Sequence, residues 1–209
     1  MSISVSQDRV FEKGPRVFKN SDRNALEAAL QAKEQTSGLV LDVFLFGNDT
    51  QEKILREALA LGADQAHLVQ EASLPSHSAG ISWALCYLLK EAGPFDIVFM
   101  GGPSEDPPSS QIEFRLSEAL SIPLIWNTDF SGIEGKRIKY LAGGENLSSE
   151  VPLLMTVRKD SNTPRIPNVM KIIKAARAPL VKWNLKEALE KSGVQLKGET
   201  LVRSVLTGK

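Results

Sequence analysis

The residues best placed to bind a charged ligand surround two consecutive glycines. Gly101 and Gly102 follow the apolar run 97–100, and the segment 109–113 has the composition of a helix start. Backbone N–H groups that are free at the start of a helix attract phosphate, and glycine lets a ligand approach the backbone closely. A phosphate could therefore sit on the backbone of these residues: Gly101, Gly102, Ser109, Ser110, Gln111 and Ile112.

A second interpretation of the same segment needs no ligand. Ser110 and Glu113 have the spacing of a capping box, which satisfies the first amides of a helix from within the chain. The glycines also lack the spacing of a dinucleotide fingerprint or a P-loop. The local sequence leaves both interpretations open.

Other groups that could do chemistry are few. His67 and His77 have no serine or cysteine placed to form a nucleophile and base pair, and we expect both at the surface or its boundary. Cys86 stands alone in an apolar helical pattern, where a buried thiol is expected. One cysteine and two histidines exclude an internal disulfide and a Cys/His zinc site. We predict no metal site and no catalytic residue.

Composition narrows the class of protein further. The chain has 209 residues, with 25 basic residues against 25 acidic ones, so no overall field gathers nucleic acid. Its first residues show no signal or transit pattern, and no apolar run reaches membrane-spanning length. We expect a cytoplasmic protein that binds no nucleic acid and does not insert into a membrane.

The elements that would position the glycines alternate between strand and helix. Apolar runs at 39–46, 66–69 and 97–100 predict buried strands, and the helical patterns 22–34, 51–61 and 81–89 lie between or before them. Weaker strand patterns occur at 3–5 and 17–18. Such alternation predicts an α/β fold with a parallel sheet and helices on both faces.

The pattern changes in the second half of the chain. Segments 124–130 and 137–141 flank a glycine-containing turn and predict an antiparallel pair, and 153–157 predicts a strand that returns to the sheet. Beyond residue 180 the sequence is polar apart from a short helical pattern at 185–191. We predict one α/β domain over residues 1–180 and a C-terminal arm over 181–209.

Four stretches in order resemble a known family. They are the helix at 22–30, Leu55-Arg56-Glu57-Ala58-Leu59-Ala60-Leu61-Gly62-Ala63-Asp64, the stretch from Lys139 through Gly143-Gly144-Glu145 to Thr156, and Asn162-Thr163-Pro164-Arg165 with Pro167-Asn168-Val169-Met170-Lys171. Together they resemble the electron-transfer flavoprotein beta subunit family over roughly residues 19–179. The last stretch is the most specific.

The resemblance implies a Rossmann-like fold of the adenine nucleotide alpha-hydrolase type. It also implies an electron carrier that does no bond chemistry itself, pairs with an alpha subunit to hold FAD, and serves a redox partner dehydrogenase. AMP or a second FAD would bind the beta subunit itself, with Phe46 and Gly47 as further contact positions beside the glycine segment. A stand-alone adenine-nucleotide-binding module remains the alternative.

The chain departs from the family pattern at both implied sites. Pro107-Pro108 replaces an acidic pair, and Ser110, Ile112 and Ser21 replace other expected residues. In the loop by which the family docks redox partners, only Ile166 separates Arg165 from Pro167, where about four residues are usual. Ile166 is the candidate anchor, with Arg165 and Pro167 beside it; the other interpretation is that Ile166 packs on its own domain.

Overall fold

The computed structural model describes residues 2–6, 20–70, 78–102, 112–191, 194–197 and 200–203. Several predicted features lie outside these residues: the strand at 17–18, His77, and the phosphate contacts Ser109, Ser110 and Gln111.

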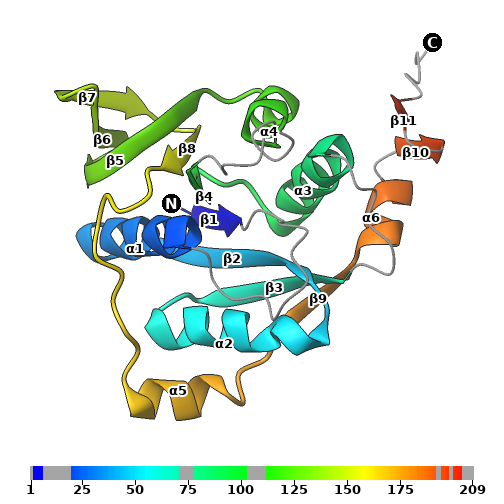
Figure 1. Ribbon diagram of the computed structural model, residues 1–209, viewed down its shortest axis with the longest axis horizontal. Helices are drawn as coiled ribbons and strands as arrows, with labels where there is room; N and C mark the ends of the chain where they lie inside the picture. The colour runs from blue at the N-terminus through cyan, green and yellow to red at the C-terminus, as the bar shows by residue number, and fades with distance from the viewer. Residues whose placement is uncertain are drawn as a thin grey trace.

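One sheet of nine strands organises the described part of the chain (Figure 1). Its order is β7-β6-β5-β8-β4-β1-β2-β3-β9, and every neighbouring pair from β5 to β9 is parallel. The strands are β1 (Ser2–Ser6), β2 (Val40–Gly47), β3 (Gln65–Gln70), β4 (Ile97–Gly101), β5 (Leu124–Glu134), β6 (Arg137–Ala142), β7 (Glu145–Glu150), β8 (Leu153–Val157) and β9 (Val181–Asn184).

Helices cover both faces of this sheet. Helices α1 (Asn20–Gln35) and α2 (Glu52–Leu61) bury their apolar stripes in one cluster, and a short 3-10 turn, η1 (Asp49–Gln51), precedes α2. Helices α3 (Ser78–Ala92) and α4 (Ile112–Leu120) pack in the cluster on the opposite face. Seven of the eight β2 residues are buried, as two covered faces require. The predicted Rossmann-like α/β fold is confirmed.

The direction of strand addition reverses beside β1. Strands β2 and β3 follow on one side of β1, whereas β4 and β8 lie on its other side. A crevice forms at such a reversal because the helices that follow the two central strands lie on opposite faces of the sheet. The carboxyl ends of β1 and β4 therefore mark the place where a doubly wound fold binds ligands.

The antiparallel addition is confirmed and is one strand longer than predicted. β5 pairs antiparallel with β6, and β6 with β7. Gly143 and Gly144, with φ of 60° and 87°, form the tight turn between β6 and β7. Positive φ at both central residues suits the twist of a two-residue hairpin, and glycine adopts it without strain.

The end of the described chain contains elements that the sequence pattern did not predict. Helix α5 (Val169–Ala175) packs against α2, and β9 then joins the edge of the main sheet beside β3. Helix α6 (Leu185–Lys191) agrees with the predicted helical pattern, and β10 (Val194–Lys197) pairs with β11 (Thr200–Arg203). The division at residue 180 stays a prediction, although β9 belongs to the sheet of the preceding domain.

The histidine prediction is wrong for His67, whereas Cys86 is buried as expected. His67 is 3% exposed, because its ring stacks on Phe44 and accepts a hydrogen bond from the indole of Trp183. Local sequence cannot show either contact. None of the helices described here combines the length and apolarity needed to cross a membrane.

Candidate functional site

Gly101 lies at the carboxyl end of β4, pressed against the start of α1. A Cβ at Gly101 would lie 2.6 Å from Oδ1 of Asp22, 2.9 Å from Oγ of Ser21 and 3.0 Å from the backbone nitrogen of Asp22. Asp22 itself is 1% exposed. The first turn of α1 therefore closes one side of the crevice at the reversal of strand order, and only glycine fits there.

Gly102 meets the neighbouring strands in the same way. A Cβ on it would lie 2.7 Å from the carbonyl oxygen of Val157 and 3.3 Å from Oδ1 of Asn127. Asn127 has a left-handed φ of 53°, and its N–H donates a 2.6 Å hydrogen bond to Oγ1 of Thr156. The sequence prediction missed Asn127, because a bulge in β5 is what turns it toward the glycines.

Three other predicted contacts, Phe46, Gly47 and Ile112, are buried. Phe46 and Ile112 are 5% and 2% exposed and belong to the apolar cluster under α3. A Cβ on Gly47 would lie 1.9 Å from Oε1 of Gln51, because that side chain folds back to accept from the N–H of Asn48. Their role as ligand contacts stays a prediction, because these buried residues present no exposed side chain at this edge.

Glu113 lies in the first turn of α4 and is fully buried. Burial raises its pKa above the ordinary value, while the amides of Glu113 and Ile112 act in the opposite direction. Within the described part of the chain, neither carboxyl oxygen has a partner with the geometry of a full hydrogen bond. A carboxyl biased toward its neutral form adds little negative charge where the phosphate was predicted. The predicted capping box stays untested, since Ser110 lies outside the described residues.

A second group of predicted residues lies in the loop between β8 and α5. Asn162 is fixed to α1, because the side-chain NH₂ of Asn24 donates to its carbonyl and side-chain oxygens at 2.8 Å each. The side-chain NH₂ of Asn162 donates in return to the carbonyl of Asn24 at 2.9 Å, and the N–H of Asp160 donates to Oδ1 of Asn24. This exchange fixes the loop to the same helix that closes the glycine crevice.

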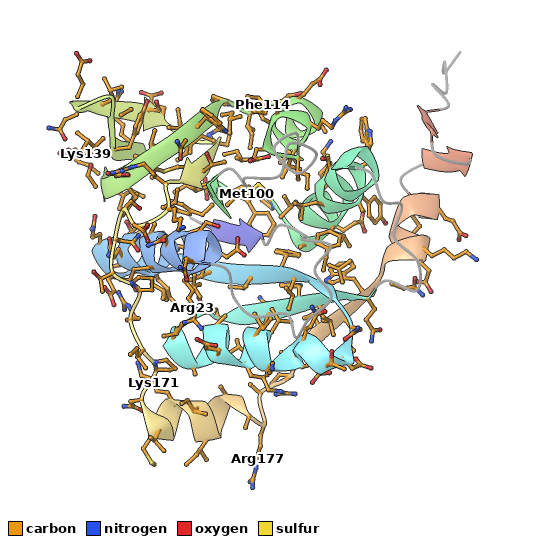
Figure 2. The ribbon with its side chains drawn as sticks, viewed as in Figure 1. Arg23, Met100, Phe114, Lys139, Lys171 and Arg177 are labelled. Carbon is orange, nitrogen blue, oxygen red and sulfur yellow. The ribbon has the colours of Figure 1, made fainter. Side chains whose placement is uncertain are left out.

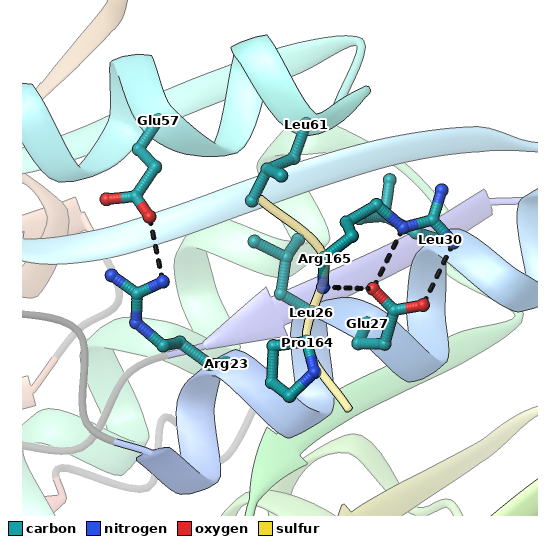
Figure 3. Close-up of a pocket in the computed structure, with 8 residues that line it drawn as sticks. All are labelled: Arg23, Leu26, Glu27, Leu30, Glu57, Leu61, Pro164 and Arg165. Atoms are coloured by element: carbon teal, nitrogen blue, oxygen red, sulfur yellow. Dashed lines mark hydrogen bonds and ion pairs between the residues drawn. The ribbon is translucent and has the colours of Figure 1, made fainter. Parts of the chain in front are cut away.

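Arg165 fixes the other end of the loop (Figure 3). Its Nε and Nη2 each donate to the Glu27 carboxylate at 2.9 Å, and it also pairs with Glu34. Burial alone would raise the pKa of Glu27, but hydrogen bonds, mainly from Arg165, outweigh burial and hold it below the ordinary value. The space between α1, α2 and Pro164 is about 10 Å³, room for one water molecule at most. The role of Arg165 here is therefore structural, because its ion pairs hold the loop against α1.

Ile166 follows this clamp and is 89% exposed. It does not pack on its own domain, and Pro167 beside it is half-buried. Helix α5 continues the apolar surface with four exposed side chains: Val169, Met170, Ile172 and Ile173. The only buried residue of α5 is Ala175, and Arg177 points away from the body of the protein (Figure 2). The loop and helix therefore present apolar side chains outward.

The fold and these two regions define a class of protein. It is a Rossmann-like α/β protein whose two consecutive glycines lie at the reversal of strand order, where such sheets bind nucleotides, and whose loop before α5 exposes an apolar residue.

Comparison with known proteins gives the family. The model of the electron transfer flavoprotein domain matches residues 9–188. Electron transfer flavoprotein subunit beta of Bacillus subtilis (strain 168) is 33% identical over 209 residues, covering 96% of this chain and 80% of the relative. The chain belongs to the electron transfer flavoprotein beta subunit family, a family of electron carriers.

Two further relatives widen the comparison. The beta subunit of Megasphaera elsdenii is 29% identical over 206 residues, covering 92% of this chain and 76% of the relative. Subunit CarD of the caffeyl-CoA reductase-Etf complex of Acetobacterium woodii is 29% identical over 178 residues, covering 81% of this chain and 67% of that subunit.

Proposed function

We propose that this chain pairs with an alpha-type subunit to hold FAD, and that the pair passes electrons between a dehydrogenase and a redox acceptor. The observation that carries the proposal is the family match over residues 9–188. The name of the Acetobacterium woodii relative, a subunit of a reductase-Etf complex, supports association with a reducing or oxidising enzyme. FAD supplies the electron chemistry when bound, and this chain binds and orients it.

The crevice suits the phosphate end of a nucleotide. Gly101 and Gly102 pack closely against Asp22 and the carbonyl of Val157, and they lie at the carboxyl ends of the central strands, where a doubly wound sheet binds ligands. Phe46, Gly47 and Ile112 stay the further proposed contact positions, although all three are buried in this structure. We propose AMP or a second FAD as the ligand within this chain, alongside the FAD shared with the alpha subunit.

Co-expression with an alpha-type subunit from the same organism tests the main proposal. We expect a yellow heterodimer that releases FAD on denaturation, and mass spectrometry of the released material should also show AMP or more than one FAD per heterodimer. A chain that stays monomeric and colourless in the same cells would overturn the pairing.

A stand-alone adenine-nucleotide-binding module is the second candidate. It is favoured by the position of the glycine crevice, which the described residues of this chain form without a partner. In that case the purified monomer would carry an adenine nucleotide and would never acquire flavin, whatever alpha-type subunit is supplied.

The exposed loop leads to a prediction for partner docking. Replacing Ile166 by alanine should slow electron transfer from the dehydrogenase about tenfold, as expected for an apolar anchor that enters a partner pocket. The free energy of unfolding should change by less than about 0.5 kcal/mol, because the side chain is 89% exposed.

Leu147→Ala is the matched control, since Leu147 is an exposed aliphatic residue of β7. Stopped-flow reduction of the heterodimer by the dehydrogenase measures the rate. Equal rates for the Ile166 variant and the wild type would rule out Ile166 as the anchor, and a loss of flavin or of stability would assign it a structural role instead.

A further inference from the structure

A buried polar cluster lies on the α3 side of the sheet. It joins Asp42 of β2, His67 of β3 and Trp183 of β9. Asp42 is 6% exposed and His67 is 3% exposed. The His67 ring stacks on Phe44 with ring centres 4.2 Å apart and an interplanar angle of 10°. The cluster therefore ties together three neighbouring strands of the parallel sheet.

The hydrogen bonds determine where the proton on His67 lies. The indole Nε1 of Trp183 is only a donor, and it lies 3.0 Å from Nδ1 of His67. Nδ1 must therefore be an unprotonated acceptor, which leaves the ring proton on Nε2. Nε2 faces Oδ2 of Asp42 at 3.6 Å, too far for a hydrogen bond. In the part of the chain that the structure describes, Nε2 of His67 and Oδ1 of Asp42 are both buried without a hydrogen-bond partner.

Among the described residues, β9 is held by its main-chain pairing with β3 and by few other side-chain contacts. It is a four-residue strand at the edge of the sheet, with Trp183 half-buried and its other three side chains exposed. Trp183 packs against the apolar cluster under α3, whereas Lys182 forms exposed ion pairs with Asp49 and Glu52. Exposed pairs of this kind contribute little to stability. The bond between Trp183 and His67 is the buried polar link between β9 and the rest of the sheet.

We propose that His67 is an acid-sensitive latch for β9 and for helix α6, which follows it directly. Protonation of Nδ1 converts the acceptor into a donor, so the indole N–H of Trp183 then faces another N–H and the bond is lost. The imidazolium gains an attraction to the Asp42 carboxylate on its other side. Acid therefore loosens the edge strand while His67 stays in the core.

The inference rests in part on the proposed function. If the region after residue 180 helps to hold the alpha subunit, release of β9 regulates that pairing by pH. Titratable groups also occur on the described elements that surround the cluster. They are the Cys86 thiol and Tyr87 phenol of α3, Asp96 beside Phe95, Lys182 of β9, and Lys186, Glu187 and Glu190 of α6.

Hydrogen exchange of the isolated chain tests the latch directly. Amides of β9 should exchange about tenfold faster at about pH 5.5 than at about pH 7.5, after correction for the intrinsic pH dependence of exchange, while amides of β2 stay unchanged. Trp183→Phe removes the donor and keeps the aromatic packing. In this variant β9 should exchange at one corrected rate at both pH values.

Asp42→Asn should reduce the effect of acid on β9 exchange without abolishing the hydrogen bond between Trp183 and His67. It provides a second variant for the exchange measurement if Trp183→Phe folds poorly. A wild-type β9 whose corrected exchange is the same at both pH values would overturn the latch, and so would a Trp183→Phe variant that keeps the full acid response. The affinity for the alpha subunit at the two pH values is measured separately. An acid-labile β9 with no effect on affinity would leave the latch standing and remove its role in pairing.

Discussion

Replacing Arg165 by alanine should lower the free energy of unfolding by about 2–3 kcal/mol. The substitution leaves the Glu27 carboxylate, only 5% exposed, without the guanidinium that donates to both of its oxygens. Removing one partner of a buried ion pair costs about 3–5 kcal/mol, and the partial exposure of Arg165 reduces this figure. Chemical denaturation measures the change.

The same clamp predicts a dependence on pH. The folded-state pKa of Glu27 lies below its ordinary value of 4.5, so its contribution to stability is present above that value and is lost as the pH falls through the folded-state pKa. The wild type and the Arg165→Ala variant should therefore differ fully above pH 4.5 and converge as the pH falls below the folded-state pKa of Glu27.

Arg137→Ala is the matched control, because Arg137 pairs with Glu150 where both side chains are more than half exposed. It should change stability by less than about 1 kcal/mol. Equal losses in the two variants would contradict the structural role assigned to Arg165. Since the clamp precedes Ile166 directly, the Arg165 variant should also dock its redox partner more slowly.

The sequence predicts the parallel sheet well because its strands are apolar on both faces. The apolar runs at 39–46 and 97–100 become β2 and β4 within one residue at each end. Strand β7, in contrast, has Leu147 as its one apolar residue and forms because the Gly143-Gly144 turn pairs it with β6. A strand that depends on its neighbour leaves no periodic pattern of its own.

Helix α5 was not predicted from the sequence, for a different physical reason. A helical stripe is recognised when it marks the face that packs inward, but the apolar residues of α5 face outward and only Ala175 is buried. The burial of His67 was not predicted because its hydrogen-bond partner Trp183 lies 116 residues away in the sequence. Arg165 and Glu27 are 138 residues apart, so no local pattern could show whether Arg165 forms a structural ion pair or is an ordinary surface charge.

Part of the candidate site could also be predicted from local sequence, and part of it could not. Gly101 and Gly102 were predictable because they follow a buried strand, and a glycine at a strand end is a local signal. Asn127 and the carbonyl of Val157 come from other strands, and only the sheet order brings them to Gly102. The sequence therefore predicts the glycines at the end of β4 that are proposed to face a ligand, whereas the residues packed around them follow from the topology.

Gly102→Ala should abolish nucleotide binding by this chain and lower the free energy of unfolding by about 1–3 kcal/mol. The new methyl group would lie 2.7 Å from the carbonyl oxygen of Val157, a main-chain atom of the adjacent strand that cannot move without disturbing β8. Relief of the clash shifts the backbone that the phosphate would contact.

The matched control for Gly102→Ala is Gly135→Ala. Gly135 has a positive φ of 58° in the β5–β6 turn and no atom near its missing Cβ, so alanine there should cost about 1 kcal/mol without touching the crevice. Thermal unfolding compares the stability of the two variants, and mass spectrometry measures the nucleotide released from each. Nucleotide retained at full occupancy by the Gly102 variant would place the ligand elsewhere, whereas loss from both variants would show that binding follows overall stability. Loss from the Gly102 variant alone would tie the ligand to the strand-reversal crevice, because only that substitution changes the backbone at the carboxyl end of β4.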